Sequence, residues 1–439
     1  MKIKTKEKSY EEVLALPATS HKKPLKQGLF WRTLLRAVST PDLLATRFKC
    51  KKIGMERLGK KEPALFLMNH SSFIDLKIAS TVLYPRPFNI VCTTDGFVGK
   101  NLLMRLLGCI PTTKFVTDLN LVRDMVYATK KLKSSVLMFP EAGYSFDGTA
   151  TALPDSLGKC AKLLGVPIVI IQTHGAFARD PLYNNLQHRR VKVSATMEYL
   201  LSPEEIKTLS AEEIAARIGE KFTFDSFRWQ QENKVKIGEP FRADCLNRVL
   251  YKCPACEVEG EMLGVGTTLT CKHCGKAWEL DEYGYLKATA GETEFSHVPD
   301  WYAWERECVR REIEANTYAL DLAVEIYVLT DTKCLYHVGE GNLTHTRAGF
   351  HLTGCEGKLN YTQDPILSYT LNSDFNWYEI GDVISIGTKN LVYYCFPKEA
   401  GDFAAKARLA TEEIYKLVRE ERASLHRAAV GAKKQNSTV

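Results

Sequence analysis

Short apolar runs alternate with amphipathic segments along the chain from Ala64 to about Met197. Continuous apolar runs of strand length are typical of strands buried on both faces of a parallel sheet, and apolar residues at helical spacing indicate helices. We expect strands at residues 64–68, 88–92, 136–139, 166–172 and 191–197, and helices at 74–83, 101–107, 121–132 and 156–164. The alternation predicts an α/β domain over residues 63–222 with a mostly parallel sheet.

The C-terminal part of the chain, residues 291–428, has a different pattern. A helix is expected at 291–319, followed by short β-rich runs between Leu322 and Pro397 and a helix from Asp402 to about Leu425. Strands followed by one helix predict a small β-rich domain closed by that helix. The pattern weakly resembles PH or GRAM-type lipid-binding domains, and a plain interaction domain is the alternative. Residues 429–439 are expected to form a disordered tail.

In the N-terminal segment, residues 1–62, basic residues are interspersed with apolar residues. Residues 1–20 read as a polar lead-in, and residues 22–61 hold twelve Lys and Arg against two acidic residues. An amphipathic helix is expected from Pro24 to Pro41, which should end it, with a short helix at 43–48. Such a helix, containing Trp31, suits the headgroup region of a membrane surface. The alternative is a helix packed on the α/β domain with a solvated basic face.

Length and composition place the protein in a broad class. A chain of 439 residues is too long for a single hydrophobic core, so we expect two or three domains. The 45% of hydrophobic residues argues against a disordered chain. The N-terminus lacks the pattern of a signal peptide, and no run of about 18 apolar residues occurs. Thirteen scattered cysteines suggest a reducing compartment. We therefore expect a cytoplasmic protein, peripheral on the inner face of a membrane.

Two CxxC pairs lie in residues 223–290, which we interpret as a connector and a zinc ribbon. Cys253, Cys256, Cys271 and Cys274 have the spacing of two knuckles that hold a structural zinc ion in a tetrahedral site. A redox dithiol pair is the alternative. Six acidic residues near the pairs argue against nucleic acid as a partner.

The strand expected at 64–68 leads into His70, and Asp75 follows five residues later at the start of a helix. Acyl transfer to an alcohol needs a general base that works near neutral pH, and histidine supplies one. A carboxylate on the other ring nitrogen can fix the tautomer and orientation of that base. The more ordinary interpretation is a helix-capping Asp beside a structural His.

A second buried strand, 136–139, ends in Pro140 and the turn Glu141-Ala142-Gly143-Tyr144-Ser145. Small residues in such a turn let backbone N–H groups approach an oxyanion or a phosphate. Glu141 is a candidate site carboxylate, and capping of the turn is its structural alternative.

These segments resemble the glycerolipid acyltransferase family of the 1-acyl-glycerol-3-phosphate acyltransferase (PlsC) type. Asn69-His70 through Asp75 matches the first motif of that family, and Gly108 through Lys114 is similar to the second, which usually ends in Arg. Phe139 through Ser145 is similar to the third, usually Phe-Pro-Glu-Gly-x-Arg-Ser, and Val166-Pro167-Ile168 is similar to the fourth. The resemblance covers about residues 25–220.

The resemblance implies that His70 deprotonates a lipid hydroxyl, that Asp75 orients His70, and that the alkoxide attacks the thioester of acyl-CoA or acyl-carrier protein. Backbone donors near Ala142 and Gly143 would stabilise the oxyanion. Lys114, Glu141 and Tyr144 occupy positions that bind glycerol phosphate in the family. Lys114 and Tyr144 each replace an arginine, and a lysine or a phenol cannot reproduce bidentate contacts to phosphate.

We therefore expect an acyltransferase that acylates a lysophospholipid or a related lipid hydroxyl. The replacements at Ala142 and Tyr144 leave a second hypothesis open, a catalytically degenerate protein that binds lipid and recruits partners to membranes.

Overall fold

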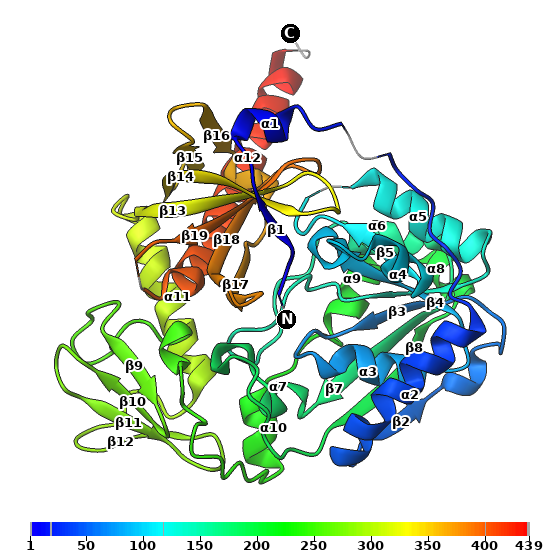
Figure 1. Cartoon of the computed structure of the whole chain (residues 1–439), viewed down its shortest axis with the longest axis horizontal. Helices are drawn as coiled ribbons and strands as arrows, with labels where there is room; N and C mark the ends of the chain where they lie inside the picture. The colour runs from blue at the N-terminus through cyan, green and yellow to red at the C-terminus, as the bar shows by residue number, and fades with distance from the viewer. Residues whose placement is uncertain (1, 18–19, 117, 400, 437–439) are drawn as a thin grey trace.

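The alternating first half of the chain folds around a seven-stranded sheet (Figure 1). The computed structural model describes residues 2–17, 20–116, 118–399 and 401–436, and side chains up to residue 425. The strand order is β2-β8-β7-β3-β6-β4-β5. The strands are β2 (Lys49–Ile53), β3 (Leu65–Met68), β4 (Phe88–Thr93), β5 (Cys109–Thr112), β6 (Ser135–Met138), β7 (Ile168–His174) and β8 (Ser194–Leu201).

The sheet is mixed. The five strands β7-β3-β6-β4-β5 are parallel, whereas β8 is antiparallel to β7 and β2 is parallel to β8. The expectation of a mostly parallel sheet is therefore confirmed, with β7–β8 as the antiparallel pair. A parallel return requires a crossover connection, usually a helix. Between β7 and β8 the chain forms only the short α7 (Ala176–Arg179) and a 3-10 turn, and β8 returns in the opposite direction.

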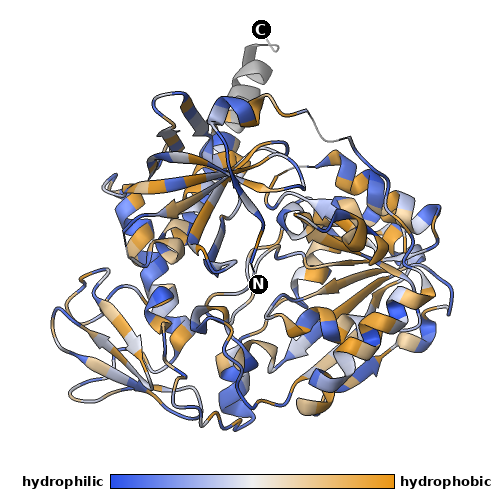
Figure 2. Cartoon of the chain, in the orientation of Figure 1, coloured by the Kyte–Doolittle hydropathy of each residue, from blue (hydrophilic) through white to orange (hydrophobic). Residues whose placement is uncertain are grey.

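Alternate residues of the central strand β3 supply the two cores of this domain. Phe66 and Met68 face one core, which includes α3, and Leu65 and Leu67 face the other, which includes α5, α6 and α9. Figure 2 shows the apolar strands between the helices on both faces. The helices are α3 (Ile74–Val82), α4 (Asn101–Leu106), α5 (Leu119–Lys130), α6 (Leu157–Leu164), α8 (Pro203–Thr208), α9 (Ala211–Gly219) and α10 (Ser226–Glu232).

The basic segment forms one helix, α2 (Leu29–Ala45), rather than a helix that ends at Pro41 and a second short one. Pro41 lies inside it. Proline cannot donate to the carbonyl four residues earlier. In the turn before the proline, the hydroxyls of Ser39 and Thr40 donate to the carbonyls of Leu35 and Arg36. α2 packs on α3, where the hydroxyls of Ser39 and Ser80 lie 3.0 Å apart.

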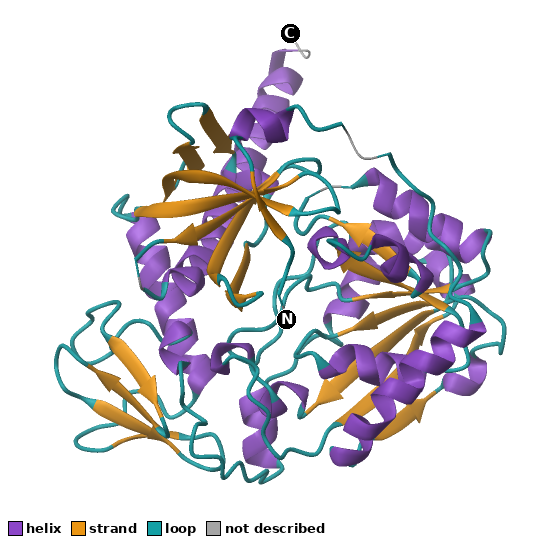
Figure 3. Ribbon diagram, in the orientation of Figure 1, coloured by secondary structure: helices purple, strands orange, loops and turns teal. Residues whose placement is uncertain are grey.

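The C-terminal module is an antiparallel sheet followed by a long helix (Figure 3). Its order is β16-β15-β14-β13-β19-β18-β17. The expected β-rich module closed by a helix is present, while its likeness to PH or GRAM-type domains stays a prediction. The elements are α11 (Val298–Glu314), β13 (Leu320–Leu329), β14 (Leu335–Thr346), β15 (Gly349–Gly354), β16 (Leu359–Gln363), β17 (Asn372–Trp377), β18 (Gly381–Gly387), β19 (Val392–Pro397) and α12 (Phe403–Asn436).

Both ends of the chain differ from the expectation. The first residues are not a polar lead-in: β1 (Thr5–Glu7) pairs with β14, and α1 (Tyr10–Leu14) buries Tyr10 and Val13 in the core of the C-terminal module. The phenol oxygens of Tyr10 and Tyr393 lie 2.8 Å apart. At the other end, α12 continues to Asn436, where a disordered tail was expected from residue 429. Residues 437–439 lie outside the described residues.

A small four-stranded sheet separates the two larger parts along the chain. It lies beside the N-terminal end of α11, where the rings of Trp278 and Trp301 have centroids 4.9 Å apart. Trp278 is fully buried within it. Its strands are β9 (Met262–Val265), β10 (Thr268–Cys271), β11 (Ala277–Leu280) and β12 (Leu286–Ala288).

Candidate active site

His70 follows the C-terminal end of β3, and Asp75 lies in the first turn of α3. His70 Nδ1 and Asp75 Oδ2 are 3.0 Å apart. The same carboxylate oxygen accepts the backbone N–H groups of Ser71 and Ser72 at 2.8 and 3.1 Å. Because an ionised carboxylate only accepts, this contact assigns the proton of the neutral imidazole to Nδ1 and leaves Nε2 as the base. Asp75 is thus both a helix-terminal acceptor and the group that orients His70.

Two aromatic rings pack against the imidazole. The ring of Phe139 stacks on it at a centroid distance of 4.2 Å, and the ring of Tyr144 lies at 4.1 Å. The His70 side chain stays 22% exposed while Asp75 is buried. The base is therefore fixed in position and remains accessible.

Glu141 links the loop after β3 to the loop after β6. Its Oε2 accepts the N–H of His70 at 2.9 Å, and its Oε1 accepts the N–H of Thr151 at 2.9 Å. Burial raises the pKa of Glu141 to about 7, although both hydrogen bonds favour the ionised form. Glu141 acts here through the backbone of His70, so its observed role is to position the base.

The turn after Glu141 differs in detail from the expectation. The Ala142 N–H donates to the Phe139 carbonyl at 3.0 Å and is not free for an oxyanion. The Gly143 N–H has no acceptor among the described residues and remains the candidate donor. The Ser145 hydroxyl is buried and donates to the Thr149 carbonyl at 2.6 Å, so it supports the loop rather than facing a substrate.

Tyr144 stands where the family usually has an arginine, and an arginine reaches this turn from elsewhere. Arg408 of α12 is buried and donates to the Tyr144 carbonyl and the Ser373 carbonyl, each at 3.1 Å. Its guanidinium also lies 3.6 Å from the ring centroid of Phe146. The sequence pattern around residue 144 gave no sign of this residue. An Arg within the alanine-rich start of the last helix was the only available signal.

Lys114 follows β5 and faces the C-terminal module. Its ammonium favours the ionised form of Asp374 in β17, whose pKa burial raises to about 6. Asp374 in turn contributes to the raised pKa of Tyr144, which is due mainly to burial. Asp374 was missed because it lies far from every motif in the sequence.

The four cysteines converge as the spacing predicted. Their sulfur atoms all lie within 4.8 Å of one another. The Sγ–Sγ distances Cys253–Cys274 and Cys256–Cys271 are both 3.8 Å. This equals the edge of a tetrahedron whose Zn–S bonds are about 2.3 Å long. The donor set therefore fits a metal ion bound by four thiolates.

Comparison with known proteins agrees with the position of the site. Residues 49–172 match the Acyltransferase family model. The matched segment runs from β2 to β7 and contains His70, Asp75 and Glu141, so the comparison supports acyltransferase activity for this domain. It does not extend to the cysteine cluster or the C-terminal module.

Among solved structures, the chain is similar to the 1-acyl-sn-glycerophosphate (LPA) acyltransferase PlsC from Thermotoga maritima. The identity is 19%, the TM-score is 0.34, and the alignment covers 47% of this chain and 80% of that chain. No curated protein matches the chain.

Ala142 has a φ of 55°, in the left-handed region that disfavours residues with a Cβ atom. We expect Ala142→Gly to raise the free energy of unfolding by up to about 1 kcal/mol, because it relieves this strain. Thermal and urea unfolding of the two proteins measure the change. A loss of stability would show that the Ala142 methyl group contributes more by packing than its backbone costs.

Proposed function

We propose that the chain transfers a fatty acyl group from acyl-CoA or acyl-carrier protein to the hydroxyl of a lysophospholipid or related lipid at a membrane surface. The observation that carries this proposal is the hydrogen bond between Asp75 and His70 Nδ1, which directs Nε2 of an accessible imidazole outward. His70 takes the proton of the acceptor hydroxyl, and the alkoxide attacks the thioester carbonyl. The ester C–O bond forms, the C–S bond breaks, and the leaving thiolate takes the proton from His70. The Gly143 N–H, which has no acceptor among the described residues, is the candidate donor to the developing oxyanion.

His70→Ala should lower kcat/KM about 10²–10⁴-fold, because it removes the general base. Asp75→Asn should also lower it strongly, because the amide no longer selects the Nδ1–H tautomer. Lipid mass spectrometry after incubation with acyl-CoA and lysolipids measures both. His351→Ala is the matched control, since it removes an exposed histidine of β15.

The second candidate is a degenerate acyltransferase domain that binds lipid and recruits partners. Its specific support is the packing of Phe139 and Tyr144 against the His70 ring. It predicts lipid binding without turnover, and equal binding by wild type and His70→Ala. Acylated product that depends on His70 excludes it.

The proposed location is the inner face of a membrane, in the cytoplasm. No helix in the described part of the chain is long and apolar enough to cross a bilayer. α2 nevertheless exposes a set of large apolar side chains on a basic segment: Leu29, Phe30, Val38 and Leu44. Phe73, beside the start of α3 and 5.8 Å from the ring of Tyr144, is 60% exposed. These side chains suit a helix lying in the headgroup region next to the site.

The double variant Leu29→Ser/Phe30→Ser should bind anionic vesicles about tenfold more weakly or worse, because it removes two apolar anchors. Vesicle sedimentation measures the partition. Val265→Ser, which removes an exposed apolar residue of β9 far from α2, should leave the partition unchanged. Equal binding by all three proteins would place the membrane contact elsewhere.

We also propose that Cys253, Cys256, Cys271 and Cys274 hold a structural zinc ion. A closed site of four thiolates has no open position for substrate, so the ion has a structural role only. The four-stranded sheet and the N-terminal end of α11 depend on it for their order.

Elemental analysis should find about one zinc per chain, and chelation or Cys256→Ser should lower the melting temperature. Cys160→Ser, outside the cluster, should retain the metal. If the protein carries no metal and mass spectrometry shows two disulfides in the cluster, the dithiol alternative is correct.

A further inference from the structure

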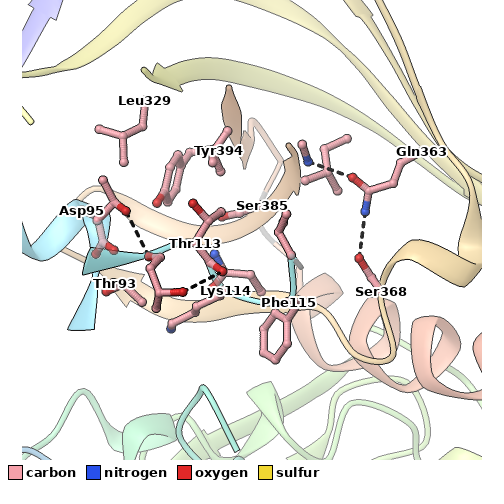
Figure 4. Close-up of a pocket in the computed structure, with 17 residues that line it drawn as sticks. Thr93, Asp95, Thr113, Lys114, Phe115, Leu329, Gln363, Ser368, Ser385 and Tyr394 are labelled. Atoms are coloured by element: carbon pink, nitrogen blue, oxygen red, sulfur yellow. Dashed lines mark hydrogen bonds between the residues drawn. The ribbon is translucent and has the colours of Figure 1, made fainter. Parts of the chain in front are cut away.

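A cleft of about 580 Å³ is lined by the loop after β6 and by the helix pair α11 and α12. The loop contributes Thr149 and Thr151 to the lining, α11 contributes Tyr302, and α12 contributes Arg408. The volume is within the range of small-molecule sites. A second pocket, beside Lys114 (Figure 4), has about 30 Å³, which is space for about one or two water molecules. The larger cleft therefore has room for a substrate group, and the smaller pocket does not.

Hydrogen bonds join the lining of this cleft to the loop that carries the base. Glu141 accepts the N–H of Thr151 with one oxygen and the N–H of His70 with the other, each at 2.9 Å. Arg408 donates to the carbonyl of Tyr144 at 3.1 Å, and the ring of Tyr144 lies 4.1 Å from the His70 ring. A lipid whose hydroxyl lies at His70 would therefore have the cleft within reach of its headgroup.

The buried end of the cleft contains a positive charge without an acidic partner. Arg408 is 6% exposed, forms no ion pair with a carboxylate of the described residues, and its Nε has no hydrogen-bond partner. Its two other guanidinium nitrogens donate to neutral carbonyl groups. The hydroxyl of Tyr302, which lines the same cleft, is also buried without a partner. A buried cation without a counter-charge costs free energy, and an anion in the cleft would offset that cost.

The other charged groups at the buried end are already satisfied within the protein. Glu412 pairs with Arg306 at 2.7 Å. Asp147 accepts the N–H and the hydroxyl of Thr149 at 3.1 and 2.9 Å, and burial raises the pKa of Asp147, which favours its neutral form. One unpaired guanidinium matches the single negative charge of a phosphodiester better than the higher charge of a phosphate monoester at neutral pH.

The exposed end of the cleft suits a cation. Asp300, in the first turn of α11, is exposed and forms no ion pair among the described residues. The rings of Tyr369 and Tyr415 also line the cleft, and aromatic faces attract organic ammonium groups. The two basic residues at this end are already paired with carboxylates, Lys416 with Glu413 at 2.6 Å and Arg419 with Asp155 at 2.7 Å.

We propose that this cleft binds the zwitterionic headgroup of the lysophospholipid acceptor, a phosphodiester of an amino alcohol such as choline or ethanolamine. The order of charges matches the order of groups in such a lipid. Its glycerol hydroxyl lies at His70, its phosphate at the buried end beside Arg408, and its ammonium group at the exposed end beside Asp300. The inference rests on the proposed acyltransferase function.

Calorimetry without an acyl donor tests the cleft apart from turnover. The full-length protein is titrated with glycerophosphocholine, glycerophosphoethanolamine and glycerol 3-phosphate, which share glycerol phosphate and differ in the amino alcohol. We expect at least one of the two zwitterions to bind about tenfold more tightly than glycerol 3-phosphate. Equal or tighter binding of glycerol 3-phosphate overturns the inference.

Two substitutions of exposed residues on α11 probe the cleft without entering the core. Ala303→Trp, which fills part of the cleft, should weaken binding of the zwitterion about tenfold. Asp300→Lys should weaken it about fivefold and strengthen binding of glycerol 3-phosphate, because it reverses the charge at the exposed end. Ala216→Trp, at an exposed alanine of α9 outside the lining, is the matched control and should change neither affinity.

Equal zwitterion affinity in the wild type and in Ala303→Trp overturns the inference. Melting temperatures verify that the variants fold, and Asp300→Lys keeps the test valid if Ala303→Trp does not.

A turnover experiment separates this inference from the proposed function. The wild type is offered lysophosphatidylcholine, lysophosphatidylethanolamine and lysophosphatidate with acyl-CoA or acyl-carrier protein. A higher kcat/KM for a zwitterionic lysolipid, lowered selectively by Ala303→Trp, supports the inference. Preference for lysophosphatidate overturns it and leaves the acyltransferase function intact.

Two further outcomes identify the source of the headgroup. If phosphatidylcholine in the vesicles raises acylation of lysophosphatidate and Ala303→Trp abolishes the rise, the cleft holds a bilayer lipid, and its assignment to the acceptor is overturned. Zwitterion binding with no acylation of any lipid by either donor supports the cleft as a headgroup site and overturns the enzyme.

Discussion

The hydrogen bond between Asp75 and His70 Nδ1 is the constraint on which the chemistry depends. An imidazole is a useful base only if its free nitrogen faces the substrate, and a ring free to rotate would expose either nitrogen. Asp75 is itself held by the N–H groups of Ser71 and Ser72. Backbone N–H groups thus hold the Asp75 carboxylate in place, and the carboxylate in turn orients the His70 ring. One short segment, residues 70–75, therefore contains both the imidazole and the group that orients it.

This arrangement follows from the sheet. β3 and β6 are parallel neighbours, and Leu67 pairs with Met138. The residues that follow both strands therefore emerge at one edge, which is where α/β sheets commonly bind ligands. Glu141, in the loop after β6, joins the two loops directly, because its carboxylate accepts the backbone N–H of His70 in the loop after β3. Glu141, which the resemblance places in a phosphate site, also holds the backbone of His70.

The sequence predicted those features whose causes lie within short segments. The central strands, the helix after Asp75 and the cysteine knuckles each depend on neighbouring residues, so their patterns were sufficient. The errors have causes that are not local. Pro41 was expected to end a helix, yet nearby hydroxyls and packing on α3 allow the helix to continue. Residues 5–14 look polar alone, and their partners lie far along the chain: β1 pairs with β14, and Tyr10 meets Tyr393 of β19.

Prediction of the site from the sequence also fails where the contacts are not local. Arg408 and Asp374 come from a module more than 200 residues beyond the motifs, so no spacing rule connects them to Tyr144. A family pattern describes the α/β domain alone and assigns residue 144 the task of holding an anion. In the folded chain a tyrosine packs on the base instead, and an arginine from α12 supports the backbone of the same turn. The turn that carries Tyr144 is therefore held from both parts of the chain.

A continuous set of contacts also connects the cysteine cluster to this interface. Lys252, which precedes Cys253, donates its N–H to Glu305 of α11 at 2.8 Å. Arg306, the next residue of α11, bonds to Glu412 and Glu413 of α12 at 2.7 and 3.0 Å. One turn earlier on α12, Arg408 holds the carbonyl of Tyr144. A metal ion held by the four cysteines would therefore stabilise the helix pair that positions Arg408. Through these contacts, a displacement at the cysteine cluster would reach the turn whose aromatic ring packs on His70.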